Sequence, residues 1–275
     1  MRTIKLGVKS PEVYYLNELL SKLKYNVLVS DYFGTATDKA VKDFQLKNNL
    51  VVDGVVGLKS WSLLLEKSKN GFSVAAKLLS EQDLIDFAKQ FNIELAVVKA
   101  VNEVESNGKG FLIDGRPKIL FEGHIFWKEL EKRSINPKTY VNSNTQDILF
   151  EKYTKKYYVG GTAEYTRLDK ARNLAQDKRF VDAANSSASW GLFQIMGFNA
   201  VAIGYKTVEE FVEKMNLNEG EQLKAFGLFL QKNNLIPLLK NKNWASFALK
   251  YNGPAYKTNK YDEKLAKAYA KYAKQ

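Results

Sequence analysis

Apolar residues recur at helical spacing along most of the chain. From Ile93 to Val104 they stand at positions 93, 97, 98, 101 and 104, which is one face of a buried or half-buried helix. Glu105 follows this apolar face directly, and Ser106-Asn107-Gly108 predicts the end of the helix. Similar spacing predicts further helices over residues 13–23, 37–45, 59–65, 80–91, 207–215, 219–233, 242–251 and 261–274.

Strand signals are scarce, so the pattern predicts a mainly α protein. Only residues 119–121 favour a short strand, and residues 153–167 predict a loop that enters a helix. A polar break over residues 66–71 indicates a linker. We therefore expect a small helical domain over residues 1–68, a linker over 69–79 and a larger, mostly helical domain over 80–275.

The composition is that of an ordinary globular protein and excludes several kinds of site. Hydrophobic residues make up 45% of the chain and charged residues 26%, which does not fit wholesale disorder. The chain has no cysteine, which rules out disulfides and thiolate zinc sites. Its one histidine, His124, argues against a histidine-based triad or a multi-histidine metal site. We expect neither a metal nor a cofactor.

Charge and the first residues bear on partners and compartment. The formal net charge is +12, of which residues 1–70 contribute 11 basic minus 7 acidic residues, or +4. A basic surface suits a nucleic acid, an anionic membrane or an acidic cell wall, but no interleaving of aromatic and basic residues supports nucleic-acid binding. Residues 1–9 lack the apolar core of a signal peptide, and no apolar run approaches the ~18 residues that span a bilayer. We expect cytoplasmic synthesis and no stable membrane insertion.

Glu105 is the first candidate for a catalytic residue. A carboxyl at the end of an apolar helix is poorly solvated, which raises its pKa and favours the protonated form near neutral pH. Such a group can act as a general acid toward a glycosidic oxygen. The alternative is that Glu105 is a solvated residue in the last turn of its helix.

The first domain resembles the three-helix peptidoglycan-binding domain found at the ends of many cell-wall hydrolases. The resemblance covers residues 4–66 and depends on Phe33-Gly34, Phe44-Gln45, the turn Asp53-Gly-Val-Val-Gly57 and Trp61. Thr37 is the expected N-cap of the middle helix. We expect the three rings to form the core of the bundle, and sugar contacts to come from exposed turn residues.

Three separated motifs resemble those of the goose-type lysozyme and lytic transglycosylase superfamily. They are Val104-Glu-Ser106, Ala188-Ser-Trp-Gly-Leu-Phe-Gln-Ile-Met196 and Ala248-Leu-Lys-Tyr-Asn-Gly-Pro254. With Ile119-Leu-Phe-Glu-Gly-His124, residues 80–272 are similar to the N-acetylmuramidase domain of phage endolysins. The one departure is Lys250, where that family has arginine. The resemblance implies a lysozyme-like, mostly helical catalytic domain.

The resemblance also implies roles for single residues. Glu105 matches the general acid, and Tyr251 matches a tyrosine near it whose hydroxyl can hold the substrate or orient the carboxyl. Ser189 and Gln194 match positions that flank the cleft, although Gln194 can instead tie a loop together and Tyr251 can be a core ring. Further positions expected to contact substrate are Gly191, Asn252 and Tyr165.

The second carboxylate is less well determined. An inverting hydrolase needs a base ~6.5–9.5 Å from the acid, and a retaining one needs a nucleophile ~5–5.5 Å away. Glu122, Asp114 and Glu103 are candidates, of which Glu103 is the poorest because it points away from Glu105 on the helix. Glu122 is favoured by its motif, but it can also pin a loop through a salt bridge. His124 is expected to be a packed or hydrogen-bonded residue and not a catalyst.

The sequence thus predicts a modular endolysin that binds bacterial peptidoglycan and hydrolyses the β-1,4 bond between N-acetylmuramic acid and N-acetylglucosamine. The alternative is a lytic transglycosylase, which works with one glutamate and leaves 1,6-anhydro ends. A wall-binding or virion structural protein with a dead site would be expected to lack Glu105 or Gln194, and both are present. We expect a monomer that binds no nucleic acid, is made in the host cytoplasm and acts on the wall in the periplasm.

Overall fold

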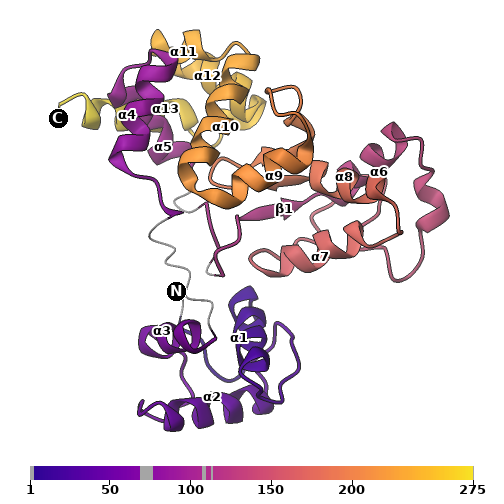
Figure 1. Cartoon of the computed structure of the whole chain (residues 1–275). Coiled ribbons are helices and arrows are strands. Elements are labelled where there is room, and N and C mark those ends of the chain that lie inside the picture. Colours follow the sequence, from indigo (N-terminus) through magenta and orange to yellow (C-terminus); the bar gives the residue numbers. More distant parts are fainter. Residues whose placement is uncertain (1–2, 69–76, 107–109, 113, 275) are drawn as a thin grey trace. The chain divides into compact units, whose positions relative to one another are not determined.

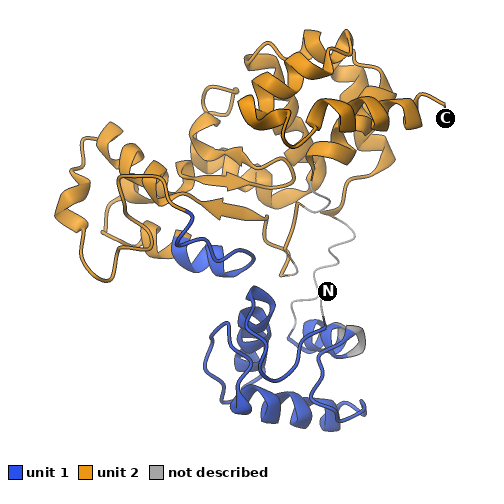
Figure 2. Cartoon of the chain, turned by 180° about the vertical axis from the view of Figure 1, so that it is seen from behind, with its two compact units in different colours: residues 1–73, 155–167 blue, residues 74–154, 168–275 orange. Residues whose placement is uncertain are grey.

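The computed structural model describes residues 3–68, 77–106, 110–112 and 114–274. They divide into two compact units (Figure 2). One comprises residues 1–73 with 155–167, and the other residues 74–154 with 168–275. The greater part of the expected linker, and Asn107-Gly108 after Glu105, lie outside the described residues.

The first 68 residues form the expected three helices, α1 (Pro11–Lys22), α2 (Thr35–Lys47) and α3 (Leu58–Lys67) (Figure 1). Their amphipathic faces close on a small core. Phe33, Phe44 and Trp61 are all buried in it, and Tyr15 stacks on Trp61 with ring centroids 6.2 Å apart. The prediction that these rings are core residues is confirmed.

A buried glutamine organises the turn between α2 and α3. Gln45 donates to Asp53 Oδ1 at 2.8 Å and accepts a bond from the backbone N–H of Gly54 at 2.9 Å. The expected cap at Thr37 is wrong, because α2 begins two residues earlier with Gly34 at its N-cap. The Thr37 hydroxyl instead donates to Asn17 inside the core.

The larger unit is also mainly helical. Ser80 and Asp83 form a reciprocal capping box at the start of its first helix. Its α-helices, with α7 shared between the two units, are α4 (Glu81–Phe91), α5 (Leu95–Glu105), α6 (Gly123–Lys132), α7 (Ala163–Arg172), α8 (Lys178–Ser186), α9 (Val208–Leu217), α10 (Glu219–Lys232), α11 (Ile236–Lys240), α12 (Trp244–Asn252) and α13 (Tyr261–Tyr272). Short 3₁₀ turns cover Pro137–Tyr140, Gly197–Asn199 and Pro254–Tyr256.

A small antiparallel sheet carries the middle of this unit. Its strands are β1 (Ile119–Phe121), β2 (Ala188–Trp190) and β3 (Ile195–Met196), in the order β1-β2-β3. Phe121 pairs with Ala188, and Ser189 pairs with Met196. The sequence predicted β1, whereas β2 and β3 were missed because strands of three and two residues are too short to show an alternating pattern.

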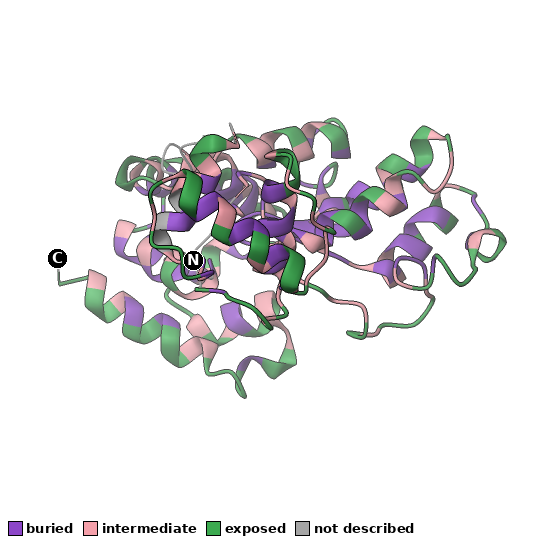
Figure 3. Cartoon of the chain, turned by 90° about the horizontal axis from the view of Figure 1, so that it is seen from below, coloured by how far each residue is buried: buried purple, intermediate pink, exposed green. Residues whose placement is uncertain are grey.

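The core around α5 positions the candidate acid. This helix packs against α4 and α13, and Figure 3 shows buried positions alternating with exposed ones along the helices. Phe193, which follows β2, stacks on Phe226 of α10 with centroids 4.1 Å apart. At the exposed edge of α5, Glu103 binds Lys271 of α13 at 2.6 Å. The C-terminal end of α5 is therefore held on both its apolar and its polar side.

Candidate active site

Glu105 is the last residue of α5, where the helix leaves the core. The apolar side of the helix faces the core, where Val97 and Val101 are buried. The carboxyl is half-buried, and this burial raises the pKa of Glu105 above its ordinary value because the charged form loses water. The carboxyl is thus poorly solvated, as the apolar pattern before it predicts.

Two groups from the C-terminal helices act on this carboxyl. Asn252 Nδ2, at the end of α12, donates a hydrogen bond to Glu105 Oε1 at 3.1 Å. Lys264 of α13 adds a positive charge nearby. Both lower the pKa of Glu105, yet burial is the largest effect and the net shift is upward. A hydrogen-bonded carboxyl with a raised pKa can donate a proton.

Tyr251 is a ring of the aromatic core beside the acid. It stacks on Phe247 with centroids 5.5 Å apart and meets Phe226 edge-on at 5.5 Å. Its hydroxyl donates to the carbonyl oxygen of Phe193 at 3.4 Å. Burial, and then the charge of Glu105, raise the pKa of Tyr251. The next residue, Asn252, orients the carboxyl of Glu105, whereas the ring of Tyr251 packs among the aromatic side chains of the core.

Ser189 and Gln194 lie at the two ends of one turn and bind each other. Ser189 Oγ donates to Gln194 Oε1 at 2.8 Å, and Gln194 Nε2 donates to the carbonyls of Gly191 at 2.7 Å and Lys118 at 3.1 Å. The backbone of Gln194 is left-handed with φ of 50°, which is uncommon for a residue other than glycine. Within this structure Gln194 therefore locks the β2–β3 turn and joins it to the residue before β1.

Gly191 allows a close approach within the protein. Its φ is 73°, and a Cβ there would lie 2.5 Å from Cδ of Gln222. Gln222 is buried in α10, accepts a bond from Leu192 N at 2.7 Å and donates to Met215 O at 2.9 Å. The absence of a Cβ at Gly191 is thus required by packing against Gln222, and its contact with sugar stays a prediction.

Gln222 and its neighbour Glu219 also hold the segment that follows the acid. Gly110 N donates to Glu219 Oε1 at 2.6 Å, and Gln222 Nε2 donates to Gly110 O at 3.5 Å. Both side chains are buried. Sequence reasoning missed them, although Gln222 stands four residues before Phe226 on the apolar face of the helix, where a polar residue signals a buried hydrogen-bonding role.

Each of the three candidate second carboxylates lies close to another titratable side chain. Glu103 binds Lys271 and Tyr272, each at 2.6 Å, and these bonds lower its pKa. Asp114 accepts from Arg116 Nε at 2.7 Å. Oε2 of Glu122, the N-cap residue of α6, lies 3.4 Å from His124 Nδ1. Burial lowers the pKa of His124, which keeps the ring neutral near pH 7.

Tyr165 belongs to the other of the two compact units. It is buried in α7, in the unit that contains residues 155–167. In the same segment Glu164 forms a buried ion pair with Arg167 at 2.8 Å and accepts bonds from the N–H groups of Val159 and Gly160. Tyr165 thus lies in the first turn of α7, in a tightly bonded segment, and its contact with substrate stays a prediction.

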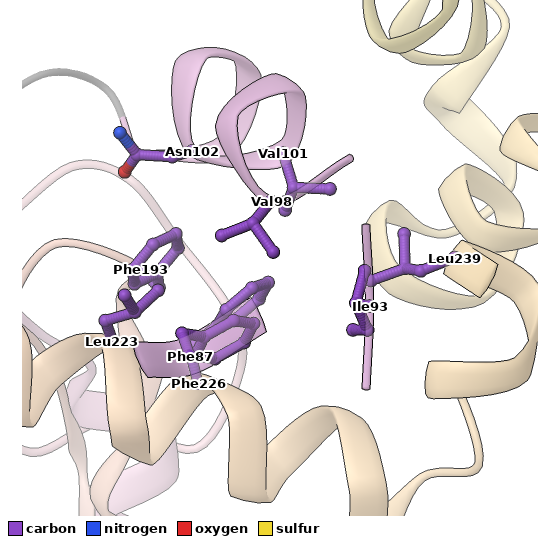
Figure 4. A pocket seen from close by; sticks show the side chains of 9 residues that line it. All are labelled: Phe87, Ile93, Val98, Val101, Asn102, Phe193, Leu223, Phe226 and Leu239. Atoms are coloured by element: carbon purple, nitrogen blue, oxygen red, sulfur yellow. The ribbon is translucent and has the colours of Figure 1, made fainter. Parts of the chain in front are cut away.

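A small apolar cavity lies behind the helix that carries Glu105 (Figure 4). Its volume is about 10 Å³, and Val98, Val101 and Asn102 of α5 line one side. A void of this size holds at most one water molecule. The cavity therefore belongs to the core and is too small to hold a sugar.

The described residues contain no group of three or more histidine and carboxylate side chains able to hold a metal ion. None of the described helices has the length and apolar character needed to cross a membrane.

Comparison with known proteins follows the same division of the chain. The family model described as N-acetylmuramidase matches residues 94–273, which is more than half of the chain. The chain belongs to the N-acetylmuramidase family. The part of this muramidase that matches the family model begins at α5 and includes Glu105, the β2–β3 turn and Asn252. A second family model, a putative peptidoglycan binding domain, matches residues 9–64.

A solved structure extends the comparison to the whole muramidase chain. The crystal structure of Burkholderia AP3 phage endolysin has 37% sequence identity, covers 100% of both chains and gives a TM-score of 0.66. Comparison with curated proteins found no match. The predicted family resemblance, the mainly α fold and the enzyme class are confirmed: this muramidase is a peptidoglycan-hydrolysing glycosidase with an N-terminal peptidoglycan-binding domain, organised as an endolysin.

Proposed function

We propose that this muramidase hydrolyses the β-1,4 bond between N-acetylmuramic acid and N-acetylglucosamine, with Glu105 as the general acid. The observation that carries the proposal is the state of the Glu105 carboxyl. It is half-buried, its pKa is raised, and its hydrogen-bond partner is the neutral amide of Asn252. Such a group remains protonated to higher pH than a solvated carboxyl and is held in one orientation.

In the proposed reaction, protonated Glu105 gives its proton to the glycosidic oxygen as the bond from the anomeric carbon to that oxygen breaks. The leaving sugar departs with a free hydroxyl, and water adds to the anomeric carbon. We assign the removal of the water proton to Glu122. Its carboxyl lies beside His124, whose pKa is lowered, so the neighbouring ring is neutral near pH 7. One carboxyl then donates the proton and a second activates the water, as in inverting glycosidases.

One observation favours the lytic transglycosylase as a second candidate. Glu103 and Asp114 are tied to Lys271 and Arg116, and Glu122 lies beside His124. If Glu122 does not act, the 6-hydroxyl of the muramic acid can attack the anomeric carbon and close a 1,6-anhydro ring. The product then lacks one molecule of water relative to the hydrolytic product.

The test is digestion of purified peptidoglycan with product identification by mass spectrometry, for the parent and for Glu105→Gln. We expect reducing muramic acid ends from the parent and a loss of ~10²–10⁴-fold in rate for the variant. Glu103→Gln is the matched control, since it lies on the same helix with its carboxylate bound to Lys271. Anhydro products would reject hydrolysis, and a folded Glu105→Gln variant with more than ~1% of the parent rate would reject Glu105 as the acid.

We also propose that the chain acts as a monomer and does not bind nucleic acid. The basic charge is shared between residues 1–70 and the rest of the chain, at +4 and +8 of the total +12. It suits an acidic wall, and no aromatic-basic interleaving accompanies it. Light scattering after size-exclusion chromatography tests the first statement, and a gel-shift assay with DNA and RNA tests the second.

A further inference from the structure

A second concave surface of the larger unit contains none of the residues discussed above as catalytic. It is a groove of about 530 Å³ between α6, α8 and residues 197–209. Phe198 and Val201 line it with 44% and 66% of their surfaces exposed. Large apolar side chains that remain exposed in a concave site mark a place where a ligand can bind.

The charged groups of the groove have both signs. Lys178 pairs with Glu209 at 3.0 Å, and Lys132 pairs with Glu129 at 2.7 Å while its ammonium lies 5.8 Å from the ring of Phe198. In the part of the chain that the structure describes, the carboxylate of Asp182 and the ammonium of Lys206 make no hydrogen bond or ion pair, although the charge of Asp182 helps to raise the pKa of Lys178. The groove therefore offers an unpaired carboxylate, an unpaired ammonium and an apolar surface.

The position of the groove connects it to the candidate acid. The turn of the β2–β3 hairpin adjoins the acid site, since Tyr251 binds Phe193 O and Asn252 binds Glu105. The other end of the hairpin, at Gly197, lines the groove. Gln194 and Gly197 are three positions apart in the sequence, with only the two residues of β3 between them, so their Cα atoms lie at most about 10 Å apart.

We propose that this groove is a subsite for the stem peptide of peptidoglycan. Each N-acetylmuramic acid can carry such a peptide, and it combines small alanine methyl groups, carboxylates and the ammonium of a diamino acid. Asp182 would pair with the ammonium, Lys206 with a carboxylate, and the methyl groups would lie on Phe198 and Val201. A neutral glycan would use none of these charges, so the charge pattern favours the peptide. The proposal rests on the proposed cleavage of the glycan at Glu105.

The first test measures binding to the full chain, with Glu105→Gln as the background so that no ligand is cleaved. The probe is a soluble stem tetrapeptide with a free diamino-acid ammonium, compared with an N-acetylglucosamine tetrasaccharide in titration calorimetry. We expect the double variant Asp182→Asn, Lys206→Gln to bind the peptide ~3- to 10-fold more weakly, as losing two exposed charge pairs predicts, and to bind the sugar unchanged. Lys224→Gln, an exposed lysine outside the groove, is the control.

The second test compares rates on intact peptidoglycan with rates on glycan strands from which an amidase has removed the peptides. Here Glu105 is left unchanged. The variant Asp182→Asn, Lys206→Gln should then have a higher KM than the parent on intact peptidoglycan and the same KM on bare strands. No peptide binding by the parent, or equal losses on both substrates, would overturn the subsite. A chain that cleaves neither substrate but binds the peptide through Asp182 and Lys206 would reject the proposed function and leave the subsite in place.

Discussion

Asn252 donates a hydrogen bond of 3.1 Å to the carboxyl of Glu105 from 147 residues further along the chain. The donor is neutral, so it orients the carboxyl without neutralising a negative charge as lysine or arginine would. Its effect on the pKa of Glu105 is opposite to that of burial, and burial is the larger of the two. The protonated form is therefore favoured while the orientation is fixed.

The first prediction removes this bond. Asn252→Leu should raise the pKa of Glu105 further, because a group that lowers it is lost. Since the acid acts in its protonated form, the alkaline limb of kcat/KM against pH should move to higher pH, while kcat falls through loss of orientation. Asn252→Asp should move the limb further in the same direction, because two carboxyls in contact resist ionisation together. An alkaline limb that stays in place in both variants would show that Glu105 does not set it.

The second prediction concerns the charge of Lys264. Its ammonium lowers the pKa of Glu105, so Lys264→Gln should shift the same alkaline limb to higher pH. Because Lys264 is exposed, the shift should be largest at low ionic strength and shrink as salt screens the charge. Lys267→Gln, an exposed lysine one turn further along α13, is the matched control. Equal shifts from both lysines would mean that the net charge of the protein, and not the nearby charge of Lys264, tunes the acid.

The sequence determined the local features of the site better than its long-range contacts. The apolar face before Glu105 predicted both the helix and its last residue, and residues 119–121 form β1 as expected. The bond between Asn252 and Glu105 was not predictable from spacing, because nothing local relates residues so far apart. The resemblance placed Tyr251 near the acid, to hold the substrate or orient the carboxyl; in the structure its hydroxyl binds Phe193 O, and the neighbouring Asn252 binds Glu105.

Buried polar residues were the other gap. Glu219 and Gln222 bind backbone groups of the site region. Along the sequence, the place of Gln222 on the apolar face signals burial, but nothing there identifies its partners. Which backbone groups need such partners depends on how the loops fold. The pairing that creates β2 and β3 likewise depends on contact with β1, not on a pattern within either strand.

The third prediction tests the packing of Gly191 against Gln222. Gly191→Ala should destabilise the larger unit, since its Cβ would lie 2.5 Å from Gln222 Cδ and its φ of 73° disfavours alanine. Gln222→Ala alone should cost about 1–3 kcal/mol by leaving Leu192 N without its buried partner. The double variant should lose less stability than the sum of the two, because the clash disappears with the side chain. Additive losses in denaturant unfolding would contradict this close contact.

The fourth prediction concerns the peptidoglycan-binding domain. A chain that lacks residues 1–68 should lose more activity on intact walls than on short soluble glycan fragments. Binding of this domain to an insoluble polymer raises the local concentration of the enzyme, an effect that disappears when the substrate is small and free. Residues 1–68 alone should sediment with purified wall. Equal losses on both substrates would instead mean that the first domain supports the fold or the cleft of the second.

The last prediction follows from the net charge of +12. The Debye length falls from ~30 Å at 0.01 M salt to ~8 Å at 0.15 M, so attraction between a basic protein and an anionic wall should weaken over that range. Activity on whole wall should therefore decrease as salt rises, while cleavage of short uncharged fragments should barely change. Both sets of rates should be measured at a pH where Glu105 is fully protonated. Screening of the Lys264 charge by salt then cannot change the protonation of Glu105. A flat profile on whole wall would mean that the lysines serve solubility and packing of their stems, and that the N-terminal domain targets the wall through uncharged contacts.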